Sequence, residues 1–293
     1  AVLSPGSRSL LLTTDMMTEG VHFDLGISTY FQLGFKIVSV NVSDIYAMGG
    51  RPRYVLLDLA AGEDMDEESL ERFFDGLQAA MNHYHIKLIG GDLSSSKQGM
   101  TLSATLIGDV RRPVLRSGAE PGDRIYVTGN MGDSACGLEL LRKIRRPVSI
   151  EQGDSLDKPL KWSAMEPLIR RHLLPEARRP GRIGNVATAM IDVSDGLFID
   201  LSRLCDESRV GARVYAKLIP MSPKMKKTAS VLGLDPYRLA TSGGEDYELL
   251  FTAPPKKKIN AICIGEVTES ERVVVGKNNR EESLKGSGYQ HWH

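Results

Sequence analysis

Residues 189–204, with the sequence AMIDVSDGLFIDLSRL, predict a strand that passes directly into a helix. Residues 189–193 are a short, mostly apolar run of the kind found in buried strands. Leucines then recur at helical spacing, and Ser194 and Asp195 are residue types that favour the N-terminus of a helix. Asp192 lies where the strand is expected to end. Because open α/β sheets bind their ligands at strand ends, this stretch predicts an α/β fold with a site beside Asp192 and Asp195.

A second Ser-Asp pair, Ser43-Asp44, lies inside another helix pattern that runs from about Phe31 to Met48. Its apolar residues recur every three or four positions, and Asp44 falls on the same stripe. A carboxylate there is unusual, because charged side chains are rarely buried without a partner. A capping role does not explain a residue in mid-helix. A buried aspartate that accepts hydrogen bonds from a hydroxyl or a backbone N–H remains the alternative to a ligand-binding one.

Two further aspartates follow apolar runs. Residues 10–14 (LLLTT) predict a strand that stops at Asp15, and residues 86–89 predict a short strand that runs into Gly90-Gly91-Asp92. Aspartate beside serine or glycine at the end of an element is often a cap or turn residue, so each one taken alone has a structural explanation.

Convergence of these carboxylates would require cations. Two like charges ~4 Å apart repel by ~4 kcal/mol at an effective dielectric near 20. Oxygen ligands without a neighbouring histidine or cysteine favour Mg²⁺ over zinc. Mg²⁺ held by a few carboxylates keeps water ligands and binds phosphate groups, as in phosphoryl-transfer sites. The residues alone therefore indicate a divalent-metal and phosphate site, and no further.

The remaining pattern mixes strands and helices throughout, which predicts an α/β or α+β protein with two domains. The clearest helix covers residues 66–84, and a turn-rich segment at 116–123 separates the two halves. We place the domains at residues 1–115 and 116–293. Further strands are expected at residues 54–61, 100–110, 124–128, 213–218, 248–253, 262–267 and 272–276, and further helices from residue 132, at 165–173 and at 222–233.

Composition argues against several classes of protein. Lys plus Arg and Asp plus Glu number 37 each, so charge gives no reason to expect nucleic acid or an anionic membrane as a partner. The apolar runs are far shorter than the roughly 18–20 residues of a membrane helix. Cys136, Cys205 and Cys263 have neither zinc nor disulfide spacing, which favours a reducing cytoplasm. The sequence contains no Gly-Lys-Ser/Thr phosphate loop.

Six motifs occur in order along almost the whole chain. They are Thr13-Thr14-Asp15-Met16 with Glu19-Gly20-Val21-His22-Phe23, Val40-Asn41-Val42-Ser43-Asp44 with Ala47-Met48-Gly49, Gly90-Gly91-Asp92, Leu115-Arg116-Ser117-Gly118-Ala119, residues 191–197 (IDVSDGL) and residues 242–249 (SGGEDYEL). In this order they resemble the thiamine monophosphate kinase family. The Glu-Gly-Val-His-Phe motif favours this family over the related purine synthetases. A selenophosphate synthetase would be expected to carry a reactive Cys or selenocysteine near its N-terminus, whereas the first cysteine of this sequence is Cys136.

The resemblance implies a fold like aminoimidazole ribonucleotide synthetase, in which an N-terminal domain dimerises through its sheet and a C-terminal α/β domain covers the ATP cleft. It implies ATP-dependent phosphorylation of thiamine monophosphate to thiamine diphosphate, the final step of thiamine diphosphate biosynthesis. The transfer would be direct and in-line, with Mg²⁺, in a cytoplasmic homodimer.

The same resemblance implies a role for each matching residue. The metal ligands would be Thr13, Thr14, Asp15, Asp44, Asp92, Asp192 and Asp195, of which Asp15, Asp44, Asp92 and Asp195 would serve catalysis. The ATP contacts would be Gly91, Asp92, Arg116 and Ser194. The substrate contacts would be His22, Glu245 and a C-terminal aromatic residue, Tyr289 or Trp292.

Structural explanations stay open for several of these residues. His22 could be a packed, hydrogen-bonded histidine, and Arg116 a solvated surface charge. Tyr289 and Trp292 could simply hold the tail on the core. For the whole chain, the alternatives are a purine or selenophosphate synthetase and a non-catalytic sensor of metal or nucleotide.

The sequence also departs from the family pattern. The resemblance implies a Gly-Asp-Asp motif directly before Ala1, and we expect further residues there and near residues 255–262. Leu93 follows Gly-Gly-Asp where a threonine is usual.

Overall fold

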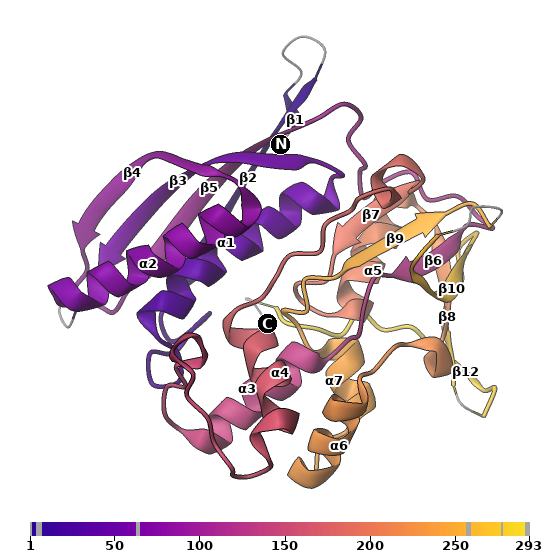
Figure 1. Ribbon diagram of the computed structural model, residues 1–293. Coiled ribbons are helices and arrows are strands. Elements are labelled where there is room, and N and C mark those ends of the chain that lie inside the picture. Colours follow the sequence, from indigo (N-terminus) through magenta and orange to yellow (C-terminus); the bar gives the residue numbers. More distant parts are fainter. Residues whose placement is uncertain (1, 4–7, 63–64, 256–258, 277, 291–293) are drawn as a thin grey trace.

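Two β-sheets, each covered by helices, make up the described part of the chain (Figure 1). This computed structural model describes residues 2–3, 8–62, 65–255, 259–276 and 278–290. The mixed α/β class predicted from the sequence is confirmed. Among the described residues, no helix is both long enough and apolar enough to cross a membrane.

The first sheet has the strand order β1-β2-β5-β3-β4. All neighbouring strands are antiparallel except β3 and β4, and the helix α2 connects this parallel pair. The strands are β1 (Val2–Leu3), β2 (Ser9–Thr18), β3 (Arg51–Ala61), β4 (Lys87–Ser95) and β5 (Thr101–Val110).

Helices α1 (Tyr30–Ala47) and α2 (Glu67–Tyr84) lie side by side on one face of this sheet (Figure 1). A capping box between Thr29 and Gln32 fixes the start of α1. The two helices approach closely, because a Cβ at Gly76 would lie only 1.8 Å from the carbonyl oxygen of Phe31. Glycine there lets α1 present one face to α2 and another to the sheet.

The opposite face of the first sheet is open. It carries exposed apolar side chains such as Met16 and Tyr54, and the edge strand β4 is exposed along its whole length. An unpaired strand edge beside apolar side chains is a common site of association.

The second sheet has the strand order β12-β11-β8-β10-β6-β9-β7. Its strands are β6 (Arg124–Val127), β7 (Ala189–Asp192), β8 (Gly211–Tyr215), β9 (Leu249–Ala253), β10 (Ile262–Thr268), β11 (Arg272–Val275) and β12 (Glu281–Ser283). Its α-helices are α3 (Asp133–Ile144), α4 (Trp162–Leu173), α5 (Leu197–Ser208), α6 (Pro223–Leu232) and α7 (Pro236–Ser242), with short 3₁₀ turns at Ile150–Gln152, Ile183–Asn185 and Ala216–Leu218.

The edge strand β7 meets the end of α1. Ala47 of α1 packs in one apolar cluster with Met190 of β7 and Phe251 of β9. Tyr247, which precedes β9, packs into the core of the first sheet. The two halves of the chain therefore join at the place where α1, β7 and the start of β9 come together.

Two predicted strand ends are wrong. β2 continues past Asp15 to Thr18, because its pairing with β5 extends to Thr101. β4 likewise contains Gly90, Gly91 and Asp92. The register between β3 and β4 shifts just before this point, and a Cβ at Gly91 would lie 1.7 Å from the carbonyl oxygen of Leu57. Backbone pairing, rather than side-chain type, decides where these strands stop.

Candidate active site

Four aspartates from both halves of the chain gather where α1 meets β7. We call Asp15, Asp44, Asp192 and Asp195 the acidic cluster; they come from β2, α1, the end of β7 and the turn before α5. The Thr13 hydroxyl donates a hydrogen bond to the Asp44 carboxylate. The Ser43 hydroxyl donates to Asp192 across the junction at 2.6 Å. Hydroxyls therefore satisfy part of Asp44 and Asp192, as the structural alternative for Asp44 supposed.

Burial raises the pKa values of three aspartates of the acidic cluster, Asp15, Asp44 and Asp192, and repulsion from other carboxylates adds to this at Asp15 and Asp192. Burial, followed by the charges of Asp44 and Asp195, raises the pKa of Asp15 to about 7. Burial, followed by the charge of Asp44, raises the pKa of Asp192. Burial also raises the pKa of Asp44, although the Thr13 hydroxyl and the Arg116 guanidinium act in the opposite direction. A bound cation would relieve this repulsion, since an opposite charge nearby favours the ionised carboxylate.

The start of α5 is organised by Asp200 and not, as predicted, by Ser194 and Asp195. One Asp200 oxygen accepts hydrogen bonds from the backbone N–H groups of Ser194, Asp195 and Gly196, each at 3.1 Å. Arg203 bonds both Asp195, at 2.6 Å, and Asp200, at 2.7 Å. Gly196 is the N-cap and has no side chain to accept the bond. α3 likewise starts after a glycine, Gly132, and has no side-chain cap.

Asp92 does not join the acidic cluster within this chain. Across the first sheet, paired residues on neighbouring strands form a row whose side chains share one face. The row of Asp92 runs through Asp58 and Ser103 to Met16, which is exposed. Asp15 belongs to the neighbouring row, which passes through Ala104 on the face that the helices cover. Asp92 therefore projects from the open face, three inter-strand steps or roughly 14 Å across the sheet from β2.

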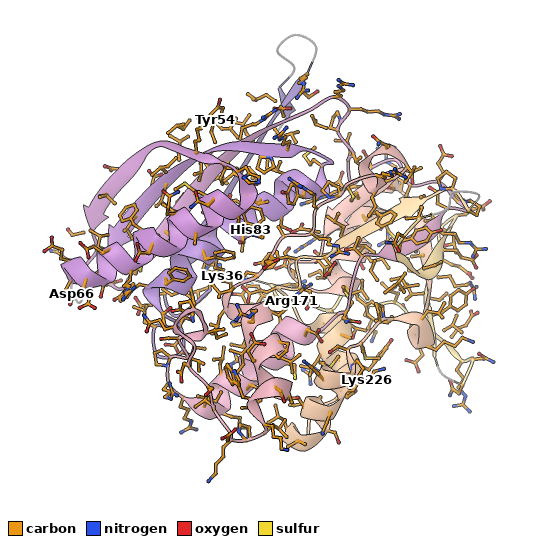
Figure 2. The ribbon with its side chains drawn as sticks, in the orientation of Figure 1. Lys36, Tyr54, Asp66, His83, Arg171 and Lys226 are labelled. Atoms are coloured by element: carbon orange, nitrogen blue, oxygen red, sulfur yellow. The ribbon has the colours of Figure 1, made fainter. Side chains whose placement is uncertain are left out.

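Glu245 forms an ion pair with the buried Lys36 of α1, and Figure 2 marks the position of Lys36. The Lys36 ammonium is 2.8 Å from Oε1 and 3.0 Å from Oε2 of Glu245, and Nδ1 of His172 is 3.0 Å from Oε2. Burial opposes ionisation of Glu245, but Lys36 and His172 together hold its pKa below the ordinary value. Burial, followed by the charge of Lys36, lowers the pKa of His172. His172 is therefore neutral near pH 7 and meets Glu245 as a hydrogen-bond donor, not as a cation.

The segment 245–248 is anchored to the end of β7. The N–H of Glu245 donates to the carbonyl of Ser194 at 2.7 Å, and the N–H of Tyr247 donates to that of Val193 at 2.9 Å. Glu245 and Tyr247 both have positive φ, at 63° and 49°. Burial, followed by the charges of Glu245 and Asp15, raises the pKa of Tyr247, which lies beside the acidic cluster.

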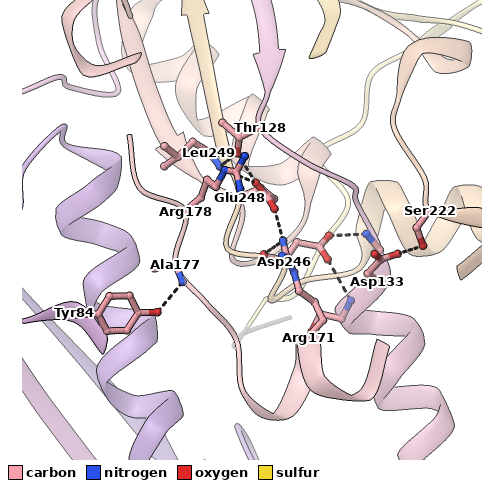
Figure 3. A network of polar contacts seen from close by, with 12 residues as sticks. Tyr84, Thr128, Asp133, Arg171, Ala177, Arg178, Ser222, Asp246, Glu248 and Leu249 are labelled. Carbon is pink, nitrogen blue, oxygen red and sulfur yellow. Dashed lines mark hydrogen bonds and ion pairs between the residues drawn. The ribbon is translucent and has the colours of Figure 1, made fainter. Parts of the chain in front are cut away.

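The alternate residues of this segment face a second polar network (Figure 3). Asp246 accepts a bond from the Gly132 N–H at the start of α3, at 2.6 Å. Arg171 reaches both the Asp246 carbonyl and the Glu248 carboxylate at 2.6 Å, and Thr128 donates to Glu248. These contacts fix segment 245–248 to the start of α3 and to Arg171 of α4.

A cleft of about 760 Å³ adjoins this second network, lined by residues that include Arg171, Arg178 and Glu248. None of the residues predicted for the site lines it, so we place the chemistry at the acidic cluster and not in this cleft.

The remaining predicted residues lie in separate places. Arg116 is exposed but near enough to Asp44 to act on its charge. His22 lies in the turn after β2, where Nδ1 accepts a bond from the Thr18 N–H at 3.0 Å. The N–H of Tyr289 donates to the Asp195 carbonyl at 3.0 Å, which brings the C-terminal tail to the acidic cluster. Trp292 lies outside the described residues.

The donor set of the acidic cluster fits Mg²⁺. Its groups are carboxylate and hydroxyl oxygens, which are the ligands of a hard cation. In the described ranges of the chain, no three His, Cys, Asp or Glu side chains form a ready-made metal site.

Sequence reasoning missed Lys36, His172, Tyr247 and Asp200. Lys36 could have been recognised from the sequence. It lies eight residues before Asp44 on the same apolar stripe of α1, where a charged side chain is equally unusual. The contacts of His172 and Asp200 depend on how segments pack together, and no pattern in the sequence indicates them.

Comparison with known proteins decides the family. Residues 1–110 match the family described as AIR synthase related protein, N-terminal domain, and residues 120–278 match its C-terminal domain. The thiamine-monophosphate kinase of Aquifex aeolicus is 37% identical over 295 residues, covering 98% of this chain and 89% of that protein. The chain belongs to the thiamine-monophosphate kinase family. The Escherichia coli K12 member is 35% identical over 302 residues, covering 98% of this chain and 88% of that protein.

Solved structures of thiamine-monophosphate kinases have the same fold. The structure of AaThiL complexed with AMPPCP and TMP superposes with a TM-score of 0.87 at 35% identity, covering 100% of this chain and 90% of that one. The thiamine-monophosphate kinase of Stenotrophomonas maltophilia K279a gives a TM-score of 0.81 at 29% identity, covering 96% of this chain and 88% of that one. These findings confirm the resemblance and the two-domain fold inferred from the sequence.

Proposed function

We propose that this protein phosphorylates thiamine monophosphate with ATP and Mg²⁺, giving thiamine diphosphate in the last step of its biosynthesis. The observation that carries the proposal is the acidic cluster, in which both halves of the chain contribute carboxylates beside the guanidinium of Arg116. The family and the ATP analogue and TMP in AaThiL supply the reaction. We assign the ATP- and metal-binding and dimerisation domain to residues 1–115, and the α/β domain, which adds Asp192 and Asp195 to the acidic cluster, to residues 116–293.

Of the metal ligands predicted from the resemblance, Asp15, Asp44, Asp192 and Asp195 would hold Mg²⁺, with the Thr13 side chain beside them. Asp92 and the side chain of Thr14 lie on the open face of the first sheet, where Thr14 accepts a hydrogen bond from Thr105. Mg²⁺, when bound, would neutralise part of the negative charge of the ATP phosphates. The Thr13 and Ser43 hydroxyls fix the Asp44 and Asp192 carboxylates, so little reorganisation accompanies binding.

The protein's own groups would act mainly by alignment. Arg116 adds a fixed cation to the ATP phosphates, and Gly91, Asp92 and Ser194 complete the proposed ATP contacts. The phosphate of thiamine monophosphate is already ionised near neutral pH and is itself the nucleophile, so no strong base is needed. Catalysis then rests on holding acceptor and donor phosphates in line.

Substrate contacts are proposed from His22, Glu245 and Tyr289, with Trp292 as the other aromatic candidate. Since Nδ1 of His22 accepts from the backbone, the neutral ring carries its proton on Nε2 and is a donor there. An aromatic face suits the cationic thiazolium ring.

We further propose a cytoplasmic homodimer. The open face of the first sheet, with Met16 and Tyr54, and the exposed edge of β4 support association through this sheet. Asp92 projects from the same face. The free cysteines Cys136, Cys205 and Cys263 support a reducing compartment.

The test is an assay of the full-length protein with ATP, Mg²⁺ and thiamine monophosphate, in which thiamine diphosphate is separated by chromatography. Asp44→Asn should lower kcat by at least about a thousand-fold, and Asp75→Asn, an exposed aspartate of α2, should leave it unchanged. Bound ATP without thiamine diphosphate in the wild type would refute the proposed reaction and favour a purine or selenophosphate synthetase or a sensor.

A further inference from the structure

Lys36 is a buried cation whose only described carboxylate partner is Glu245. Its side chain is 5% exposed and comes from α1 in the first half of the chain, whereas Glu245 comes from the turn before β9 in the second. A buried ion pair is seldom retained for stability alone, because desolvation offsets most of the attraction. Lys36 lies on the same stripe of α1 as Asp44, about two turns or roughly 12 Å earlier along the helix, and this location points to a role at the substrate.

The two carboxylate oxygens of Glu245 are not equivalent. Oε2 lies 3.0 Å from both Lys36 and His172, whereas Oε1, among the described residues, contacts Lys36 alone, at 2.8 Å. The same Nδ1 of His172 lies 3.2 Å from the Ser134 hydroxyl, which can only share the Nδ1 proton as a second acceptor while that proton is directed at Glu245. The Glu245 side chain is 29% exposed, so a ligand can reach it. Oε1 is the oxygen with the greater remaining capacity to accept a bond.

The charge of Lys36 restricts what Oε1 can accept. A second cation placed against Glu245 would lie a few ångströms from the Lys36 ammonium and would be repelled by it. A neutral N–H donor meets no such opposition, and a hydrogen bond to a carboxylate is among the stronger ones. Thiamine monophosphate offers both groups, the cationic thiazolium and the neutral amino group of the aminopyrimidine.

We propose that Lys36 and His172 are positioning residues that orient Glu245 so that its Oε1 accepts a hydrogen bond from the amino group of thiamine monophosphate. This inference rests on the proposed function, and it deepens it by naming which part of the substrate Glu245 recognises. Lys36 acts as a specificity determinant, since it excludes the thiazolium from this carboxylate. The thiazolium is left to an aromatic face elsewhere in the site.

The experiment compares thiamine monophosphate with oxythiamine monophosphate, in which oxygen replaces the amino group. Both are measured in wild type, Lys36→Met, His172→Gln and the control Lys226→Met, whose lysine is exposed on α6. Wild type should favour the amino substrate by at least about ten-fold in KM. Lys36→Met should raise KM for thiamine monophosphate about ten-fold, reduce the preference to below about three-fold and leave KM for ATP within two-fold.

The remaining variants separate positioning from folding. His172→Gln should weaken the preference in the same direction, and Lys226→Met should match wild type. If Lys36→Met does not fold, the same comparison is made with Lys36→Gln, which keeps a hydrogen-bond donor without the charge, and with His172→Gln. An unchanged preference in the folded variants would overturn the inference, as would equal losses in kcat and in both KM values.

Calorimetry without ATP keeps the two proposals distinguishable. Lys36-dependent preference for the amino ligand, without turnover in wild type, would refute the proposed kinase reaction and support the positioning of Glu245. Turnover in wild type, with equal binding of both ligands, would support the reaction and overturn the inference.

Discussion

Replacing Asp15 by asparagine is expected to stabilise the metal-free protein while removing its activity. The pKa of Asp15 is raised from 3.8 to about 7, chiefly by burial and then by Asp44 and Asp195. At about 1.4 kcal/mol per pKa unit, a fully ionised Asp15 costs roughly 4 kcal/mol of stability. An asparagine at this position would remove that cost without changing the shape of the side chain.

The direction with pH follows from linkage. Because the folded pKa lies above the unfolded one, the folded state binds more protons, and stability is lost as pH rises through about 7. Asp15 alone should account for about 1.4 kcal/mol lost between pH 6 and pH 8. Asp246, whose pKa burial also raises to about 7, adds a loss of the same sign, so the difference between variant and wild type is the quantity to measure.

The assay is urea unfolding with EDTA at pH 6 and pH 8, with Asp75→Asn, an exposed aspartate of α2, as the matched control. Asp15→Asn should be more stable than wild type at pH 8 by roughly 4 kcal/mol, and the gain should shrink by about 1.4 kcal/mol at pH 6. Mg²⁺ should stabilise wild type at pH 8 more than the variant. An Asp15→Asn protein that is no more stable than wild type at pH 8 would refute the electrostatic account of the acidic cluster.

Two further substitutions test the scaffold by urea unfolding. Gly91→Ala should cost about 2–4 kcal/mol, because its Cβ would lie 1.7 Å from the Leu57 carbonyl oxygen; a loss below about 0.5 kcal/mol would contradict the close approach of β3 and β4. Glu248→Gln should cost about 3 kcal/mol, since Glu248 is buried and its charge faces the partly buried Arg171, whereas Glu166→Gln, whose partner Arg170 is exposed, should cost less than about 1 kcal/mol. Equal losses in both glutamate variants would show that the burial of the Arg171 pair is unimportant.

The sequence was sufficient to predict elements whose side-chain period is strong. The helix of α1 was expected at 31–48 and found at Tyr30–Ala47, since its apolar stripe is long and regular. The same stripe singled out Asp44, whose neighbour Ser43 is brought by packing to Asp192 from 149 positions away. The short helix α7 and the edge strand β12 were not anticipated, because seven and three residues give too few periods to recognise.

Contacts between distant segments could not be predicted. The side on which Asp92 emerges depends on the register shift between β3 and β4, and a shift of one residue reverses the face. Lys36 and Glu245 are 209 residues apart, and only the joining of the two halves makes them partners. Individual residues of the acidic cluster could therefore be predicted from the sequence, whereas the contacts through which Lys36 and His172 orient Glu245 could not.

The measurement that tests the central claim most directly is ³¹P NMR of the full-length protein with ATP, Mg²⁺ and thiamine monophosphate. The account predicts that the thiamine monophosphate signal is replaced by the two coupled signals of thiamine diphosphate, in step with ADP. No phosphate should be released beyond the rate without acceptor. ADP with free inorganic phosphate, or an unchanged thiamine monophosphate signal while ATP is consumed, would contradict it.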